Sequence, residues 1–131
     1  INIINTMNKD VIDAYINRRS DKALSVWSRD LVVEDNEAIG NERTGLLFRD
    51  AQTCEIRRNN LEGNGQGMFF FSSTDNVIVN NRIAGNEVGA KVWAGSIRNE
   101  VRGNRFLANR QQVFYVGAED LLWGETGGNI W

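Results

Sequence analysis

The sequence predicts an all-β fold, a parallel β-helix in which each turn of the chain forms one rung of about 22–23 residues. The main observation is a residue pair, Gly-Asn or Ala-Asn, that recurs at intervals of 23, 22 and 23 residues. A further asparagine comes five residues before the asparagine of each pair. This unit is too short for a propeller blade and lacks the helical half of most solenoid repeats. The pairs are Gly40-Asn41, Gly63-Asn64, Gly85-Asn86 and Ala108-Asn109.

Three short apolar segments in each unit predict three strands per rung. The first segment has an apolar residue three positions before the further asparagine, and the second has one two positions after it. The third segment comes later in the unit, beyond the Gly-Asn turn. The positions are Val33, Ile56, Ile78 and Val101 in the first segment, Ala38, Leu61, Ile83 and Phe106 in the second, and residues 45–48, 67–70, 89–92 and 112–115 in the third.

The further asparagines, one in each rung, predict a ladder of stacked side-chain amides. Rungs of a parallel β-helix stack at roughly 4.8 Å, so equivalent side chains lie above one another inside the coil. Each amide can then hydrogen-bond the next, while the asparagine backbone takes a bend that β-branched residues resist. We therefore expect a structural role for Asn36, Asn59, Asn81 and Asn104.

The length of 131 residues predicts a single domain, residues 1–131, because a chain of this size buries one core. Residues 23–116 carry the regular rungs, which with an earlier rung make roughly five. Residues 117–131 leave the repeat, and we expect them to cap the last rung with apolar side chains. These are Leu121, Leu122, Trp123, Ile130 and Trp131.

Residues 1–22 form either a degenerate rung or an N-terminal cap. The spacing favours a rung, since Val11 and Ile16 lie 22 residues before the equivalent positions of the next unit. The alternative is a helix capped by Thr6 or Asn8 that covers the end of the coil.

The composition excludes several classes of function. The net charge of −2 argues against a nucleic-acid partner that binds through bulk charge. The absence of His excludes Ser-His-Asp, Cys-His and His-ligated metal chemistry within this chain. No apolar run approaches the roughly 20 residues of a membrane span, so we expect no direct membrane insertion. The chain begins at Ile1 without a leader, and we expect a fragment whose signal peptide was removed or lies outside it.

The outer face of the third segment predicts a binding surface. If Leu46, Met68 and Ala90 point inward, alternation sends their neighbours outward as a strip of large apolar side chains, interrupted by Arg49 and Lys91. Exposed strips of this kind usually contact a partner or ligand. Two alternatives stay open: a register shifted by one residue, or a flanking segment that covers the strip. Besides Leu47, the strip contains the candidate binding residues Trp27, Phe69, Phe71, Trp93 and Phe114.

Other signals are weaker. The 12 Arg against 3 Lys favour a surface for an anionic polysaccharide or a protein, or only a solvated edge. Polysaccharide cleavage needs converging acids. Asp50 falls near Ser28 and Ser72 in successive rungs, but a second acid is missing. We therefore predict no catalytic residue and no enzyme.

Copper chemistry would depend on three soft side chains, Cys54, Met7 and Met68. Met68 occupies a core position and Cys54 a strand start, so we do not expect the two to meet at one site. We predict no metal ligand, and the single Cys54 cannot form an internal disulfide.

Residues 28–131 resemble the C-terminal half of the NosD-type nitrous oxide reductase maturation proteins. The most specific part is the exit from the repeat, residues 104–117, followed by residues 122–123 and 127–131. It is similar to the family's end-of-helix pattern, which leads into a Gly-Asn-Tyr-Trp-Ser signature. Ile130 replaces the usual Tyr, and the chain stops before the Ser and the acidic segment that normally follows.

The resemblance implies a right-handed parallel β-helix of the carbohydrate-binding and sugar-hydrolase repeat class, located in the periplasm. It implies an accessory role, without hydrolysis, in assembling the copper–sulfur centre of nitrous oxide reductase. The implied partners are a cognate ABC transporter, a copper chaperone and the reductase, and copper enters only through this family role. The aromatic strip is then the expected docking face. Two alternatives remain: a β-helix that binds or processes an acidic polysaccharide, with the strip stacked on sugar rings, and a structural fragment without a site.

Overall fold

The computed structural model describes residues 24–26, 29–93, 95–116, 122–123 and 128–131, and all their regular structure is β. The strands are short, and every third one along the four complete rungs has five or six residues. They are β1 (Leu24–Val26), β2 (Val32–Glu34), β3 (Glu37–Ile39), β4 (Thr44–Arg49), β5 (Glu55–Arg57), β6 (Asn60–Glu62), β7 (Gln66–Phe71), β8 (Val77–Val79), β9 (Arg82–Ala84), β10 (Val88–Val92), β11 (Glu100–Arg102), β12 (Arg105–Leu107), β13 (Gln111–Tyr115) and β14 (Leu122–Trp123).

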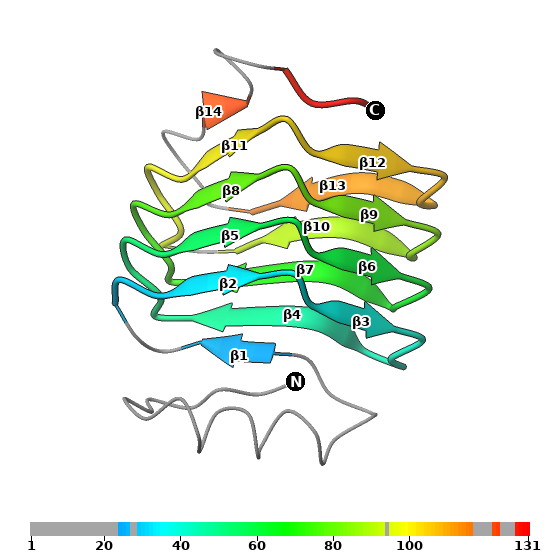
Figure 1. The fold of residues 1–131 in the computed structure, drawn as a ribbon, viewed down its shortest axis with the longest axis horizontal. Coiled ribbons are helices and arrows are strands. Elements are labelled where there is room, and N and C mark those ends of the chain that lie inside the picture. The colour runs from blue at the N-terminus through cyan, green and yellow to red at the C-terminus, as the bar shows by residue number, and fades with distance from the viewer. Residues whose placement is uncertain (1–23, 27–28, 94, 117–121, 124–127) are drawn as a thin grey trace.

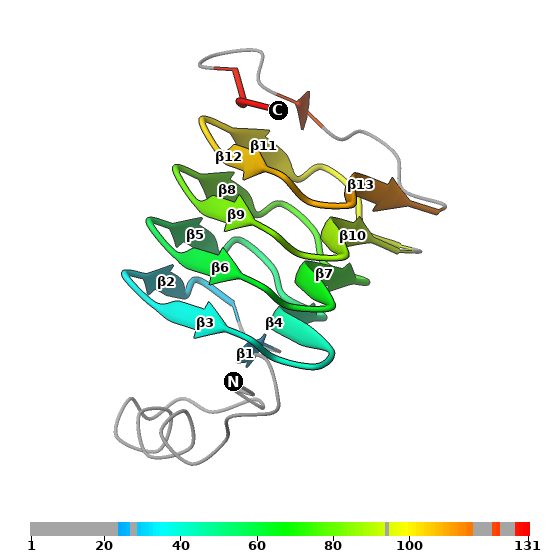
Figure 2. The ribbon, with the colours of Figure 1, turned by 90° about the vertical axis from the view of Figure 1, so that its right-hand side faces the viewer.

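The strands form three parallel sheets around one core, which confirms the predicted parallel β-helix (Figures 1 and 2). Each strand pairs with the strand three places later in the chain. The β7 sheet has the order β1-β4-β7-β10-β13, the β8 sheet β14-β11-β8-β5-β2, and the β9 sheet β12-β9-β6-β3. Four complete rungs run from β2 to β13, where the sequence predicted roughly five. Residues 1–22, to which the earlier rung was assigned, lie outside the described residues.

Apolar side chains from every rung fill the coil. Leu46, Phe48 and Met68 are almost fully buried, and the rings of Phe48 and Phe70 stack 4.8 Å apart. The register places Leu46 beside Met68, and Met68 beside Ala90, so apolar columns run along the axis. A register shifted by one residue is therefore wrong for this sheet. The inward residues of the other two sheets are those expected: Val33, Ala38, Ile56, Leu61, Ile78, Ile83, Val101 and Phe106.

The corner between the β8 and β9 sheets has the same length in all four rungs and holds a column of asparagines. Two residues separate the strands there in every rung. Asn59 donates through Nδ2 to Asn81 Oδ1 at 2.9 Å and to the Val33 carbonyl at 2.9 Å, and its backbone N–H donates to the same Oδ1 at 3.0 Å. The amide-to-amide bonds continue along the whole column, Asn36, Asn59, Asn81, Asn104 and Asn129.

The left-handed backbone at this corner falls on the residue before each ladder asparagine. The sequence had placed the bend on the asparagine itself. The backbone φ is 56° at Asp35, 52° at Arg58, 57° at Asn80 and 63° at Gly103. The preceding residue thus turns the chain, and the asparagine directs its amide into the coil, where its hydrogen bonds offset the strain of the turn.

A second ladder, which the sequence pattern did not reveal, occupies the corner between the β9 and β7 sheets. Asn64 donates through Nδ2 to Asn86 Oδ1 at 3.1 Å and to the Ala38 carbonyl at 2.8 Å. In the last complete rung, the acceptor for Asn109 Nδ2 is Gln112 Oε1 at 2.7 Å, so a glutamine of the same rung ends the ladder. The column is Asn41, Asn64, Asn86 and Asn109, the asparagines of the recurring pairs.

The length of the repeat changes from 23 to 22 residues at this corner. Asn41 is stacked on Asn64, 23 residues later, whereas Thr44 pairs with Gln66, 22 residues later. The first complete rung therefore has one residue more than the second between its asparagine and the following strand. The extra backbone passes next to Gly65. A Cβ atom at Gly65 would lie 2.6 Å from the carbonyl oxygen of Glu42 and 2.5 Å from that of Arg43. Glycine at this position therefore accommodates the longer corner below it.

The described parts of residues 117–131 lie over the last complete rung. β14 pairs in parallel with β11, and Ile130 forms a parallel bridge with Arg105. Asn104 Nδ2 donates to Asn129 Oδ1 at 3.0 Å, and the ring of Trp131 stacks on Phe106 with centroids 4.7 Å apart. The sequence had placed this whole segment outside the repeat, but these residues re-enter it as a partial rung.

Candidate interaction face

The outer face of the β7 sheet carries two adjacent columns of large side chains. They arise because neighbouring long strands pair in register, so that residues between the inward-facing positions stack from rung to rung. The exposed fraction is 39% for Trp93 and 38% for Phe114, while Phe69 and Phe71 of β7 are half-buried. The first column is Leu47, Phe69, Lys91 and Phe114, and the second contains Arg49, Phe71 and Trp93.

Two cations lie against these rings. The Lys91 ammonium is 4.4 Å from the ring centroid of Trp93, 5.1 Å from that of Phe69 and 5.8 Å from that of Phe114. Arg49 places its guanidinium carbon 5.4 Å from the centroid of Phe71. Each of the four rings therefore has a cation within cation–π distance. The sequence showed both cations as interruptions of the strip, and nothing in the spacing indicated that they would bind the rings.

A groove of about 280 Å³ lies on this face, lined by Leu47, Arg49, Phe69, Phe71 and Trp93. Phe69 and Trp93 meet edge to face, with centroids 5.9 Å apart and an interplanar angle of 61°. Four of the five candidate residues thus belong to one surface. Phe69, Phe71 and Trp93 line the groove, and Phe114 is joined to them by its contact with Lys91. Trp27, the fifth, lies outside the described residues.

The charged side chains of the β8 sheet and its corners are largely arranged in ion pairs. Arg57 Nε lies 2.6 Å from Glu34 Oε2, and Arg58 lies 2.7 Å from Glu34 and 3.0 Å from Asp35. The hydrogen bonds from Arg57 and Arg58 hold the pKa values of Glu34 and Asp35, respectively, below their usual range. Arg98 does the same to the pKa of Asp75. These pairs favour the solvated edge over an arginine surface for an anionic polymer.

The ladder asparagines Asn59, Asn81 and Asn104 are buried, and Asn36 is half-buried at the first complete rung. Their amides are occupied by one another and by backbone carbonyls of the neighbouring rung. They belong to the corner of the coil and are separate from the outer face of the β7 sheet.

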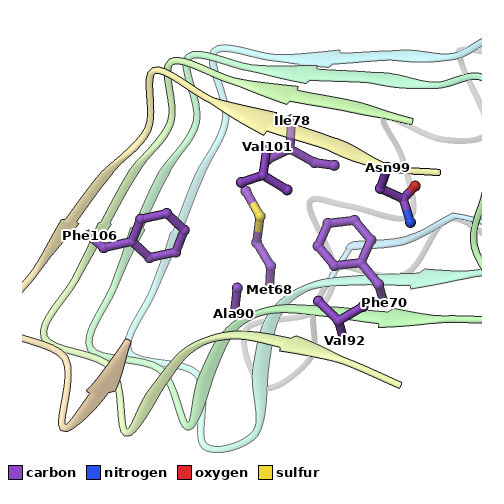
Figure 3. A pocket seen from close by; sticks show the side chains of 8 residues that line it. All are labelled: Met68, Phe70, Ile78, Ala90, Val92, Asn99, Val101 and Phe106. Atoms are coloured by element: carbon purple, nitrogen blue, oxygen red, sulfur yellow. The ribbon is translucent and has the colours of Figure 1, made fainter. Parts of the chain in front are cut away.

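The interior offers little space for a ligand. Figure 3 shows the side chains around a cavity inside the coil, with Met68 extending from beside Ala90 towards Val101, and Phe106 to one side. The volume of the cavity is about 10 Å³. All but one of its lining side chains are apolar, and the polar one is Asn99. The volume holds about one water molecule. The cavity is therefore a packing defect of the core.

The two soft side chains among the described residues, Met68 and Cys54, do not form a copper site. Met68 is 1% exposed in the core, and Cys54 is 1% exposed and donates its thiol to the Gln52 carbonyl at 3.3 Å. Burial raises the pKa of the Cys54 thiol, which disfavours the thiolate that binds metal. Within the described ranges, no three His, Cys, Asp or Glu residues gather closely enough to hold a metal ion. Met7 and Ser28 lie outside those ranges.

The comparison with protein families decides the affiliation of the chain. The family model described as "Periplasmic copper-binding protein (NosD)" matches residues 1–131. The chain belongs to the NosD family. No curated protein and no solved structure gives a significant match to it.

Membership of the NosD family, with the β-helix already described, supports a role related to nitrous oxide reductase. The description of the family names a periplasmic location and copper binding. In the part of the chain covered by the structure, no helix is long and apolar enough to cross a membrane.

Proposed function

We propose that this NosD-family chain is a periplasmic accessory protein in the assembly of the copper–sulfur centre of nitrous oxide reductase. It acts by docking proteins, without catalysis of its own. The partners are the cognate ABC transporter, the copper chaperone and the reductase. The observation that supports docking is the outer face of the β7 sheet, where the groove is walled by Leu47, Phe69, Phe71 and Trp93.

In this proposal copper is the cargo of the assembly process and is carried by the partners. The soft side chains of the described residues are buried, and one thiol with a raised pKa is a poor ligand at neutral pH. The contribution of this chain is a rigid surface, because parallel rungs with continuous hydrogen bonds hold the docking residues in a fixed pattern.

A pull-down under anaerobic conditions tests docking. The folded chain, checked by circular dichroism, is presented to the detergent-solubilised transporter, the chaperone and the apo-reductase. We expect Trp93→Ala and Phe71→Ala to abolish capture of at least one partner. Ile39→Ala is the matched control, because Ile39 is 52% exposed on the β9 sheet, away from the groove. Equal capture by all variants, or no capture by folded wild-type chain, overturns docking through this face.

The polysaccharide alternative is disfavoured by the arrangement of the rings. Sugars stack on flat ring faces, but Phe69 and Trp93 meet edge to face and share the Lys91 ammonium. Titration of tetragalacturonate with tryptophan fluorescence as the readout separates the two functions. A saturable change that Trp93→Ala removes would favour the sugar, and we expect none.

A further inference from the structure

We propose that the segment docked on the outer face of the β7 sheet is an acidic peptide of a partner protein. Its apolar side chains fill the groove between Phe69, Phe71 and Trp93, and its carboxylates pair with Lys91 and Arg49. The inference rests on the proposed docking function and adds the chemistry of the partner.

The first argument is the sign of the charge at the rings. Ring faces attract cations, and here Lys91 lies within 6 Å of three centroids while Arg49 lies within 6 Å of the fourth. A cationic ligand would meet two positive charges of the protein's own. An anionic ligand meets two donors that the rings already hold in place, so little side-chain entropy is lost on binding.

The second argument is the distribution of acids. The net charge of the chain is −2, but β4, β7, β10 and β13 contain no Asp or Glu. The acids next to these strands in sequence are Asp50, at the corner after Arg49, and Glu87, at the corner before Val88, where it pairs with Arg110. None of the ion pairs between described residues involves Lys91, whereas several arginines of the β8 sheet and its corners lie beside carboxylates. The outer face of the β7 sheet is therefore a positive patch on an acidic protein, and it complements a negative partner.

The third argument is the shape of the groove. A volume of about 280 Å³ with walls of Leu47, Phe69, Phe71 and Trp93 accepts apolar side chains. The cations lie among the same rings. A peptide that combines leucine or phenylalanine with aspartate or glutamate satisfies both features at once, and a uniformly acidic polymer satisfies only one.

Selection from a library of random dodecapeptides on the immobilised chain tests this chemistry. We expect the enriched peptides to combine Asp or Glu with large apolar residues. We also expect the affinity of a selected peptide, measured by fluorescence anisotropy, to fall about tenfold in Lys91→Met, the size of one charge-assisted contact. A comparable loss is expected in Arg49→Met, and both losses should shrink in 0.5 M salt. Methionine keeps an unbranched apolar chain on the rings, so the fold is retained.

Arg110→Met is the control, because Arg110 is exposed and pairs with Glu87 at a distant corner. Three outcomes overturn the inference: enriched peptides without acids, no enrichment, or equal affinity for wild type and Lys91→Met. Each of them leaves the pull-down free to succeed, so a wrong partner chemistry is distinguished from a failure of docking itself. Absence of peptide enrichment together with saturable tetragalacturonate binding that Trp93→Ala removes would assign the face to a sugar and overturn both.

Discussion

The amide of a ladder asparagine uses all of its hydrogen-bonding capacity. Asn81 Oδ1 accepts from Asn59 Nδ2 at 2.9 Å and from the Asn59 backbone N–H at 3.0 Å. Its Nδ2 donates to the Ile56 carbonyl and to Asn104 Oδ1, both at 2.9 Å. Two donors and two accepted bonds are what a side-chain amide offers. Aspartate would lack the donors and leucine would lack both, so the position is specific for an amide.

Asn81→Leu is expected to lower the free energy of unfolding by about 4 kcal/mol, because buried groups left without partners cost roughly 1–3 kcal/mol each. The groups concerned include the Ile56 carbonyl and the Asn59 N–H. Urea unfolding measures the loss. The control is Asn36→Leu, at a half-buried position of the first complete rung, which should cost about 1 kcal/mol. Equal losses for the two variants would contradict the ladder as a buried network.

The ion pairs at the edge of the β8 sheet predict a pH dependence of stability. The pKa values of Asp35 and Glu34 are held below 3.8 and 4.5, their ordinary values, with Arg58 contributing to both shifts. A lowered pKa in the folded state stabilises the fold above the ordinary value, and this contribution is lost as the pH falls through the folded pKa. The free-energy difference between wild type and Arg58→Met should thus be full at neutral pH and vanish in acid.

Urea unfolding between neutral pH and about pH 2 measures this difference. In 1 M salt the difference should be small at every pH, because exposed pairs are screened. A difference that does not change with pH would mean that Arg58 acts through packing alone.

At the scale of the element, the repeat was readable because the side chains that define it are equivalent in every rung. Val33, Ile56, Ile78 and Val101 lie in the strands just before the corner that has the same length in all four rungs, so their spacing predicted strands and register directly. At the corner between the β9 and β7 sheets the Gly-Asn pairs were visible, but the pattern did not show that the first complete rung has one residue more than the second after its asparagine. The partial rung formed by residues 122–123 and 128–131 was missed because its ladder asparagine, Asn129, comes 25 residues after Asn104.

The candidate face was only partly predictable. Alternation along a strand places Phe69 and Phe71 outside once Met68 and Phe70 are inside. The contacts of Lys91 depend on which way a long flexible side chain turns on the sheet surface, and a linear pattern carries no information on that. The second asparagine ladder was visible as a repeat, but its amide network depends on a corner geometry that the pattern does not specify.

Gly65→Ala is expected to destabilise the fold strongly, because the new Cβ atom would lie within 2.6 Å of two carbonyl oxygens of the longer corner. The control is Gly85→Ala: Gly85 has a φ of 63°, and a Cβ atom there would meet only the Gly63 nitrogen, at 4.0 Å. Ala108 occupies the equivalent position with a φ of 53°. That control should cost about 1 kcal/mol. Deletion of Arg43 together with Gly65→Ala should restore stability. Thermal unfolding compares the variants, and equal melting temperatures for the two single substitutions would contradict the assignment of the extra residue.

At the scale of the whole molecule, a solenoid has two open ends at which the core would meet water. At the C-terminal end the indole of Trp131 covers Phe106, which is fully buried, with an interplanar angle of 20°. The partial rung holds Trp131 there through the backbone bond from Phe106 N to the Ile130 carbonyl at 2.7 Å. The cover is therefore built by extending two sheets by a few residues.

Trp131→Ala should lower the free energy of unfolding by about 2 kcal/mol through lost stacking and burial. Trp93→Ala provides the matched control, because the same residue type is removed from the outer face. Trp93 is the less exposed of the two, at 39% against 56%, but its loss should cost less because only Trp131→Ala also uncovers Phe106. Urea unfolding gives both values. A larger loss for Trp93→Ala would mean that the outer strip, and not the partial rung, protects the core.

The longer corner at Gly65 also bears on how such a chain can change over generations. If the gene segment for one turn is duplicated together with one extra codon, the new turn can still stack on its neighbours. The extra residue is accommodated at a corner, while the strands stay in register. At the corner after Asn41 this is possible because Gly65 has no side chain at the point of contact with the surplus backbone. A change in the number of residues per turn is thus absorbed locally, and the rungs on either side keep their pairing.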